Sequence, residues 1–113
     1  MKILDRTVSR AELATIAEDL FGDMVKAVAD VAEDKLAIDA ELHSDLEQLL
    51  LQDGSQQQNL WGFNLYPDAP DEDFIEFDSL INIRPRQNNR SRDVENPEIR
   101  AKIRDIVDKY ISK

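Results

Sequence analysis

The feature that most constrains the fold is an amphipathic segment near the end of the chain, residues 96–111. Asn96 is a favourable N-cap, Pro97 suits the first helical position, and Glu98 complements the first turn. The apolar residues that follow recur at helical spacing: Ile99, Ile103, Ile106, Val107, Tyr110 and Ile111. A helix of this kind is stable only when its apolar stripe packs on another element, so the rest of the chain must supply an apolar surface.

A second amphipathic helix is predicted near the start of the chain, over residues 10–20. Ser9 and Glu12 form a capping box, in which each side chain satisfies a free backbone amide at the helix start. Apolar residues then follow at helical spacing, namely Leu13, Ile16, Ala17 and Leu20. Gly22 is a suitable stop. Both terminal helices therefore need a surface to cover.

Alternating apolar residues predict four strands between these helices, at residues 24–31, 35–42, 60–66 and 74–84. Residues 25–42 can also be read as a helix. The strongest alternation runs from Phe74 to Arg84, with Ile75, Phe77, Ile81 and Ile83 on one face and Glu76, Asp78, Asn82 and Arg84 on the other. The last two strands are predicted to form an antiparallel hairpin with a long acidic loop. Gly62, next to Trp61, indicates a bulge or a close backbone approach.

Residues 43–52 fit two descriptions. As a strand, they place His43, Asp45 and Glu47 on one face. As a helix, they predict a capping box at Ser44 and Glu47 and end before Gly54, where a C-terminal glycine belongs, and helical spacing aligns four leucines, namely Leu42, Leu46, Leu49 and Leu50. Several independent signals agree on the helix, which we therefore prefer.

These elements predict one α+β domain over residues 1–113, with an antiparallel sheet of three or four strands and the amphipathic N- and C-terminal helices packed on one face. The chain contains 42% hydrophobic residues and no cysteine, so its core must form without disulfides or thiolate metal sites. A reducing compartment is consistent with this composition.

The charge is strongly negative and unevenly distributed. The net charge is −10; residues 1–83 carry 19 acidic and 5 basic residues, whereas residues 84–113 carry 5 acidic and 9 basic ones. Phosphate repulsion opposes non-specific binding of the whole molecule to duplex DNA. The first residues lack the apolar region of a signal peptide, and the longest apolar run, Leu49–Leu51, cannot span a membrane. We therefore expect a cytoplasmic protein.

The first candidate site contains His43, Asp45 and Glu47, with His43 the only histidine of the chain. On a helix, His43 and Glu47 lie one turn apart and could pair a base with the group that orients it. A metal held there would take its other ligands from carboxylates, which suits magnesium or manganese better than zinc. The alternative is that Ser44, Asp45 and Glu47 simply stabilise a helix N-terminus.

The second candidate site is the segment 84–92, with four arginines and several side-chain amides just before a helix N-terminus. Its candidate anion-binding residues are Arg84, Arg86, Asn89, Arg90 and Arg92. The alternative is that these arginines pair with the acidic surface, within one subunit or between subunits. The sequence shows no Gly-rich phosphate loop and no Gly-x-Ser-x-Gly motif, and it identifies no cofactor.

Several segments also follow a recurrent order. The most specific are 60–67, with the sequence LWGFNLYP, and 74–85, with FIEFDSLINIRP, followed by Asn89-Arg90-Ser91. The chain resembles a family of small prokaryotic proteins catalogued as domain of unknown function 5674. The resemblance implies a stand-alone prokaryotic protein and brings no known activity. Asp39-Ala40 departs from the glycine pair that the resemblance implies, which puts a tight turn at that point in question.

Three functional hypotheses follow. The first is a binding or regulatory module, itself a homo-oligomer, whose arginine loop recognises an anionic small molecule or an acidic protein surface. The second is a small hydrolase or divalent-metal-dependent enzyme that uses His43, Asp45 and Glu47. The third is a structural subunit of an oligomer, with a large apolar interface and no polar pocket.

Overall fold

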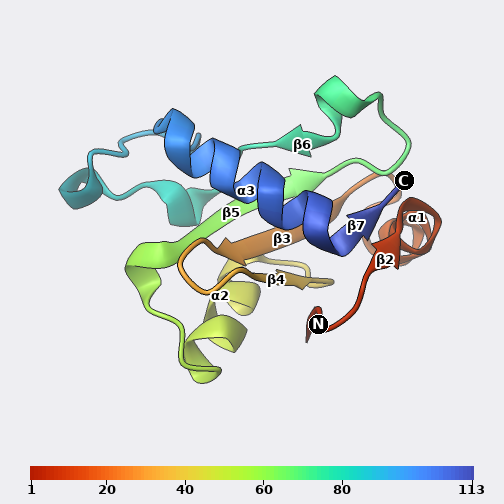
Figure 1. Cartoon of the computed structure of the whole chain (residues 1–113), viewed down its shortest axis with the longest axis horizontal. Helices are drawn as coiled ribbons and strands as arrows, with labels where there is room; N and C mark the ends of the chain where they lie inside the picture. Colours follow the sequence, from red (N-terminus) through yellow and green to blue (C-terminus); the bar gives the residue numbers. More distant parts are fainter.

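The computed structural model describes all residues, 1–113. It combines three α-helices with one main sheet (Figure 1). The helices are α1 (Arg10–Leu20), α2 (His43–Gln52) and α3 (Pro97–Tyr110). The strands are β1 (Lys2–Ile3), β2 (Val8–Ser9), β3 (Val25–Asp30), β4 (Lys35–Ile38), β5 (Leu60–Leu65), β6 (Ile75–Glu76) and β7 (Ile111–Ser112). Short 3-10 helices span Gln57–Asn59, Asp71–Asp73, Leu80–Asn82 and Pro85–Gln87. None of the helices is long and apolar enough to cross a membrane.

The main sheet has five antiparallel strands in the order β1-β4-β3-β5-β6. The mixed α+β class is therefore correct, but the predicted number of three or four strands is wrong. The additional strand is β1, which pairs Lys2 with Ile38 and is too short to show an alternating pattern. A separate parallel pair joins β2 to β7 and ties the two ends of the chain together, with Val8 opposite Ile111.

The larger core is formed by side chains from one face of the sheet together with side chains of α1 and α3. In Figure 1, α3 crosses in front of β3 and β5. The sheet contributes the large side chains Trp61 and Phe63 to this core. The helices contribute Leu13 and Ala17 from α1, and Ile103, Ile106 and Val107 from α3. The predicted apolar stripe of the C-terminal helix thus packs against apolar side chains of the sheet.

A smaller core lies on the opposite face, beneath α2. Val28 of β3 and Leu60 of β5 point to this side, because successive residues of a strand alternate between its faces. Leu46 and Leu50 of α2 pack on them. The central strands are consequently buried on both faces, which explains why β3 contains the uninterrupted apolar run 27–29.

The three predicted helices are confirmed. The capping box of α1 is present, since Ser9 accepts from the amide of Glu12 and Glu12 accepts from the amide of Ser9. Asn96 caps α3 as predicted, with Pro97 in the first helical position. For α2 the helical description is correct, but the capping box at Ser44 is wrong. The helix already begins at His43, and its N-cap residue, Leu42, has no side chain that can accept a hydrogen bond.

The chain leaves β4 through a residue in left-handed conformation. Asp39 has a φ of +74°. Aspartate tolerates this region better than most residues with a side chain. Asp39 therefore adopts the left-handed conformation that is typical of glycine, although the glycine pair implied by the family resemblance is absent at Asp39-Ala40.

The predicted strand over residues 74–84 is wrong for most of its length. Only Ile75 and Glu76 pair with β5. The chain then turns, because the Ser79 hydroxyl accepts a hydrogen bond from the amide of Ile81 and starts a 3-10 helix. Asn82, predicted on the polar face, is fully buried, whereas Ile83 is 42% exposed. The predicted antiparallel hairpin between the last two strands is confirmed for the two paired positions.

Candidate functional site

A cavity of about 570 Å³ opens beside the N-terminus of α2. Its walls come from the start of β3, the end of β5, β6 with the segment that follows it, and Arg92. The strands β3, β5 and β6 are neighbours in the sheet. The floor of the cavity is therefore the end of the sheet face that α2 covers further along.

Three polar residues form a row across this floor. Lys26 of β3 lies directly opposite Asn64 of β5, and Asn64 lies directly opposite Glu76 of β6. Residues paired in this way point to the same face of a sheet, with neighbouring strands about 4.8 Å apart. The floor therefore carries a cation at one side, an amide in the middle and a carboxylate at the other side. All three residues line the cavity.

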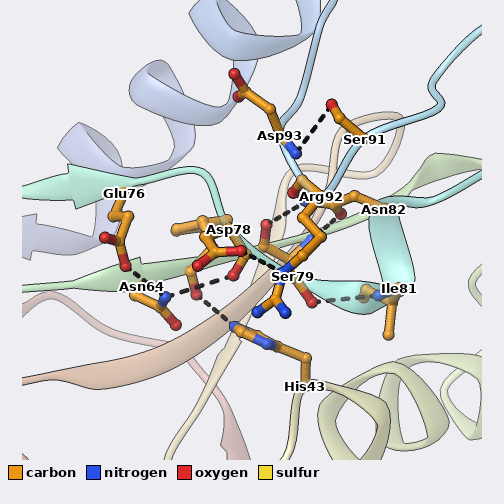
Figure 2. Close-up of polar contacts among 12 residues, drawn as sticks. His43, Asn64, Glu76, Asp78, Ser79, Ile81, Asn82, Ser91, Arg92 and Asp93 are labelled. Carbon is orange, nitrogen blue, oxygen red and sulfur yellow. Dashed lines mark hydrogen bonds and ion pairs between the residues drawn. The ribbon is translucent and has the colours of Figure 1, made fainter.

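Asn64 is buried, and its Nδ2 donates to two acceptors, one of which is the backbone carbonyl of Asp78 at 3.4 Å. Its Nδ2 donates to Glu76 Oε1 at 2.9 Å (Figure 2). Its Oδ1 is buried and accepts no well-formed hydrogen bond, but the side chain lies close enough to the His43 ring to oppose part of the lowering of the His43 pKa. The Tyr66 hydroxyl donates to the same Glu76 oxygen at 3.0 Å. Burial, followed by this hydrogen bond to a carboxylate, raises the pKa of Tyr66 to about 12. Tyr66 is thus a stable donor that fixes Glu76 at its side of the cavity.

His43 projects from the first turn of α2 into the cavity wall. Its Nε2 lies 2.8 Å from the carbonyl oxygen of Phe63. A carbonyl can only accept, so Nε2 carries the proton and Nδ1 of the neutral ring is an acceptor. Burial lowers the pKa of His43, and the ammonium of Lys26 contributes in the same direction. The ring is therefore neutral at pH 7.

The N-terminus of α2 opens at the same place. Leu42, the N-cap residue, makes no side-chain hydrogen bond to the first amides of the helix. Lys26 lines the cavity nearby, is half-buried and makes no ion pair with any carboxylate of the chain. A helix N-terminus favours negative charge, as does an unpaired ammonium group. This side of the cavity is therefore suited to an anionic group.

Arg92 is the one member of the arginine segment that lines the cavity. Its backbone carbonyl accepts from the amide of Ser79 at 3.0 Å and from the Asn82 side chain at 3.0 Å. Its Nε donates to Asp78 Oδ1 at 2.6 Å, and both side chains are about half exposed. Figure 2 shows its guanidinium extending past Ser79 in the direction of His43. The predicted histidine and arginine sites thus share one cavity, but only through His43 and Arg92.

The predicted catalytic group of His43, Asp45 and Glu47 is not assembled. Asp45 is exposed and does not line the cavity. Glu47 lies one turn further along α2, near Gln57 and Arg84. Burial raises the pKa of its carboxyl, and the positive charge of Arg84 partly opposes this shift. No three His, Asp or Glu side chains are arranged to hold a metal ion.

The side chain of Arg84 is held within the fold by contacts with β5 and the segment before it. Its guanidinium stacks on the Trp61 ring, 4.2 Å from the ring centroid. Its Nη1 donates to the carbonyl of Gln57 at 2.7 Å, and its Nη2 donates to the carbonyl of Leu60. The side chain therefore ties the arginine segment to the start of β5 and is not available to a ligand.

Asn89 also has a structural role. It is buried, and its Nδ2 donates to the carbonyl oxygens of Asn82 at 2.7 Å and of Asp93 at 2.7 Å. Its Oδ1 accepts from the amide of Glu95 at 2.8 Å. The amide side chain thus fixes the path of the loop from inside, and it is not exposed to an anion.

Arg86 and Arg90 remain exposed and make no ion pair within the chain. The backbone amides near them are already used. The Glu95 carboxylate accepts from the amides of Arg90 and Ser91, both at 2.9 Å, and from the Ser91 hydroxyl at 2.8 Å. The anion position formed by this loop backbone is therefore occupied by a side chain of the chain itself.

Sequence reasoning missed the floor of the cavity. The alternating pattern of residues 74–84 places Glu76 on a polar strand face, but neither Lys26 nor Asn64 is identified as a candidate site residue. A signal exists, because each of the two charged residues, Lys26 and Glu76, lies between two apolar neighbours in the sequence. Their alignment depends on the register of β3, β5 and β6, which the order of residues alone does not reveal.

Comparison with known proteins gives one match. The model of a family described as "Protein of unknown function (DUF5674)" matches residues 2–110. No curated protein and no solved structure matches the chain.

Proposed function

Because the chain belongs to the DUF5674 family, whose description assigns no activity, we propose a function from the cavity: the chain binds a small anionic molecule beside the N-terminus of α2. The observation that carries this proposal is the state of Lys26. Lys26 lines the cavity, is half-buried and makes no ion pair, although the chain carries 24 acidic residues; its ammonium lies 5.2 Å from the centroid of the Phe21 ring. In a chain of net charge −10, an unpaired cation in a cavity favours an anionic ligand.

The surroundings of Lys26 support the same proposal. The uncapped amides of α2 add partial positive charge, and His43 is neutral, so it neither attracts nor repels an anion strongly. Arg92 supplies a second cation at the rim, partly neutralised by Asp78. The binding module predicted from the sequence is thus retained, with its site moved from the arginine loop to the cavity.

Thermal melts test this proposal. The intact chain is heated in sodium butyrate, sodium acetate or sodium phosphate, each compared with sodium chloride of equal ionic strength. Binding to the native state must raise the melting temperature in a saturable manner. We expect Lys26→Gln to lower the affinity for the anion about tenfold, so that about ten times more salt is needed for the same rise in melting temperature. This is the size of one lost charge-assisted hydrogen bond. Lys2→Gln is the matched control, because Lys2 is exposed in β1 and does not line the cavity.

The same experiment separates the cavity from the arginine loop. Arg90→Gln removes an exposed, unpaired loop cation and should leave the effect of the salts unchanged. Loss of the effect in Arg90→Gln but not in Lys26→Gln would return the site to the loop. A cytoplasmic location and a homo-oligomeric state stay predictions from the sequence, and small-angle scattering measures the second.

A further inference from the structure

The row on the cavity floor carries opposite charges that do not neutralise each other. Lys26 and Glu76 both line the cavity, and neither makes an ion pair. They are separated by one strand, so their backbones lie about 10 Å apart. Two long side chains of opposite charge could meet over such a distance. Their separation therefore needs a physical reason.

Asn64 and Tyr66 keep the carboxylate at its own side. Both donate to Glu76 Oε1, at 2.9 and 3.0 Å, so this oxygen faces β5 and is satisfied there. At the other side, the Lys26 ammonium lies 5.2 Å from the centroid of the Phe21 ring. The cavity consequently has a positive side and a negative side, with the amide of Asn64 between them.

The acceptor in the middle of the row has no well-formed donor. Asn64 is 5% exposed, and its Oδ1 accepts no hydrogen bond of good geometry, although the side chain lies near enough to the His43 ring to raise the pKa of His43 in part. A buried acceptor without a donor costs about 1–3 kcal/mol. His43 also lines this cavity, and the Nδ1 of its neutral ring is an acceptor. In Figure 2, Asn64 and His43 lie together below Glu76 and Asp78. These groups favour a ligand that brings N–H donors with it.

A ligand with several negative charges does not fit this pattern. Its second anionic group would lie against Glu76 and Asp78, where like charges repel. A ligand with one anionic group at the Lys26 side and one ammonium group at the Glu76 side satisfies every part of the row. Building on the proposed function, we propose that the cavity binds a small zwitterion, a molecule with one carboxylate and one amine.

Isothermal titration of the intact chain with three related probes tests this inference. The probes are γ-aminobutyrate, which is a zwitterion, its N-acetyl derivative, which is only an anion, and its amide, which is only a cation. We expect the zwitterion to bind about tenfold more tightly than either derivative, because each derivative loses one charged contact. Equal binding of the zwitterion and the N-acetyl derivative would overturn the inference and leave the proposed function standing. Absence of binding by all three would overturn both.

A conservative variant identifies the residue that recognises the amine. Glu76→Gln keeps the oxygen that accepts from Asn64 and Tyr66 but removes the negative charge. Glu76→Gln should lower the affinity for γ-aminobutyrate about tenfold and change the affinity for the N-acetyl derivative by less than about twofold. Glu72→Gln, at an exposed position outside this cavity, is the control and should change neither. Equal weakening of both probes by Glu76→Gln would show a merely structural role and contradict the inference.

Discussion

The side-chain amide of Asn82 pairs with the backbone of Gly62 as a neighbouring strand would. Asn82 Oδ1 accepts from the amide of Gly62 at 2.8 Å, and Asn82 Nδ2 donates to its carbonyl at 2.9 Å. The edge of β5 beyond β6 is thus satisfied by one side chain in place of a strand. The same Nδ2 donates to the carbonyl of Arg92, so this contact also places Arg92 at the cavity.

Replacement of Asn82 should therefore be strongly destabilising. Asn82→Ala leaves the buried amide and carbonyl of Gly62 without partners, and we expect it to lower the free energy of unfolding by about 2–4 kcal/mol. Urea denaturation measures this change. Gln56→Ala, at an exposed site with no side-chain hydrogen bond, is the control and should cost less than about 0.5 kcal/mol. A loss of similar size in both variants would contradict the strand-like role of Asn82.

Gly62 is required because Ser79 approaches it closely. A Cβ at position 62 would lie 2.6 Å from Ser79 Oγ and 2.7 Å from Ser79 Cβ. We expect Gly62→Ala to destabilise the fold by about 1–3 kcal/mol through overpacking. Ser79→Gly removes both of these atoms. In the Ser79→Gly background, Gly62→Ala should therefore lower the free energy of unfolding by less than it does in the parent chain. Equal costs in the two backgrounds, measured by a double-mutant cycle, would show that the contact is not the cause.

Glu47 should make stability depend on pH in the acid range. Burial raises the pKa of its carboxyl in the folded state above the ordinary value, so the folded state binds more protons than the unfolded state between the two values. The contribution of Glu47 to stability therefore falls as pH rises through this window. Glu47→Gln should melt at the same temperature as the parent chain below the ordinary carboxyl pKa and at a higher temperature at pH 7. A lower melting temperature of Glu47→Gln at pH 7 would disprove the assignment.

Arg84 should be needed for the fold and not for ligand binding. Arg84→Lys cannot reproduce the stacking on Trp61 together with the hydrogen bonds to the carbonyls of Gln57 and Leu60. We expect a loss of about 1–3 kcal/mol in stability and a change in the fluorescence of Trp61, the only tryptophan. Arg86→Lys, in the exposed turn beside it, should change neither. An unchanged spectrum in Arg84→Lys would argue against the stacking.

The helices were predictable because their signals are local. The Ser9–Glu12 capping box and the Asn96-Pro97 start mark the beginnings of α1 and α3 within four residues of sequence. The prediction of a strand over residues 74–84 was wrong because alternating apolar and polar residues also occur where a short strand is followed by a turn. Asn82 contacts Gly62, 20 residues away, and this long-range contact decides the conformation.

The candidate site was predictable only in part, for a related reason. His43 and Arg92 attract attention by residue type, and both line the cavity. Asp45 follows His43 by two residues and therefore points to another side of α2, whereas Glu47 lies one turn further along the helix, near Gln57 and Arg84. Lys26 and Glu76 face the same cavity only because of the register of three strands, which cannot be read from residue types.

The central claim is that an anionic group binds beside Lys26 and the N-terminus of α2. Nuclear magnetic resonance of the ¹⁵N-labelled chain, titrated with sodium butyrate against sodium chloride of equal ionic strength, tests it directly. We predict saturable shifts of the backbone amides of Lys26, His43 and Ser44, with little change at Arg86 and Arg90. Shifts centred on Arg86 and Arg90, or no saturable shift at any amide, would contradict the account.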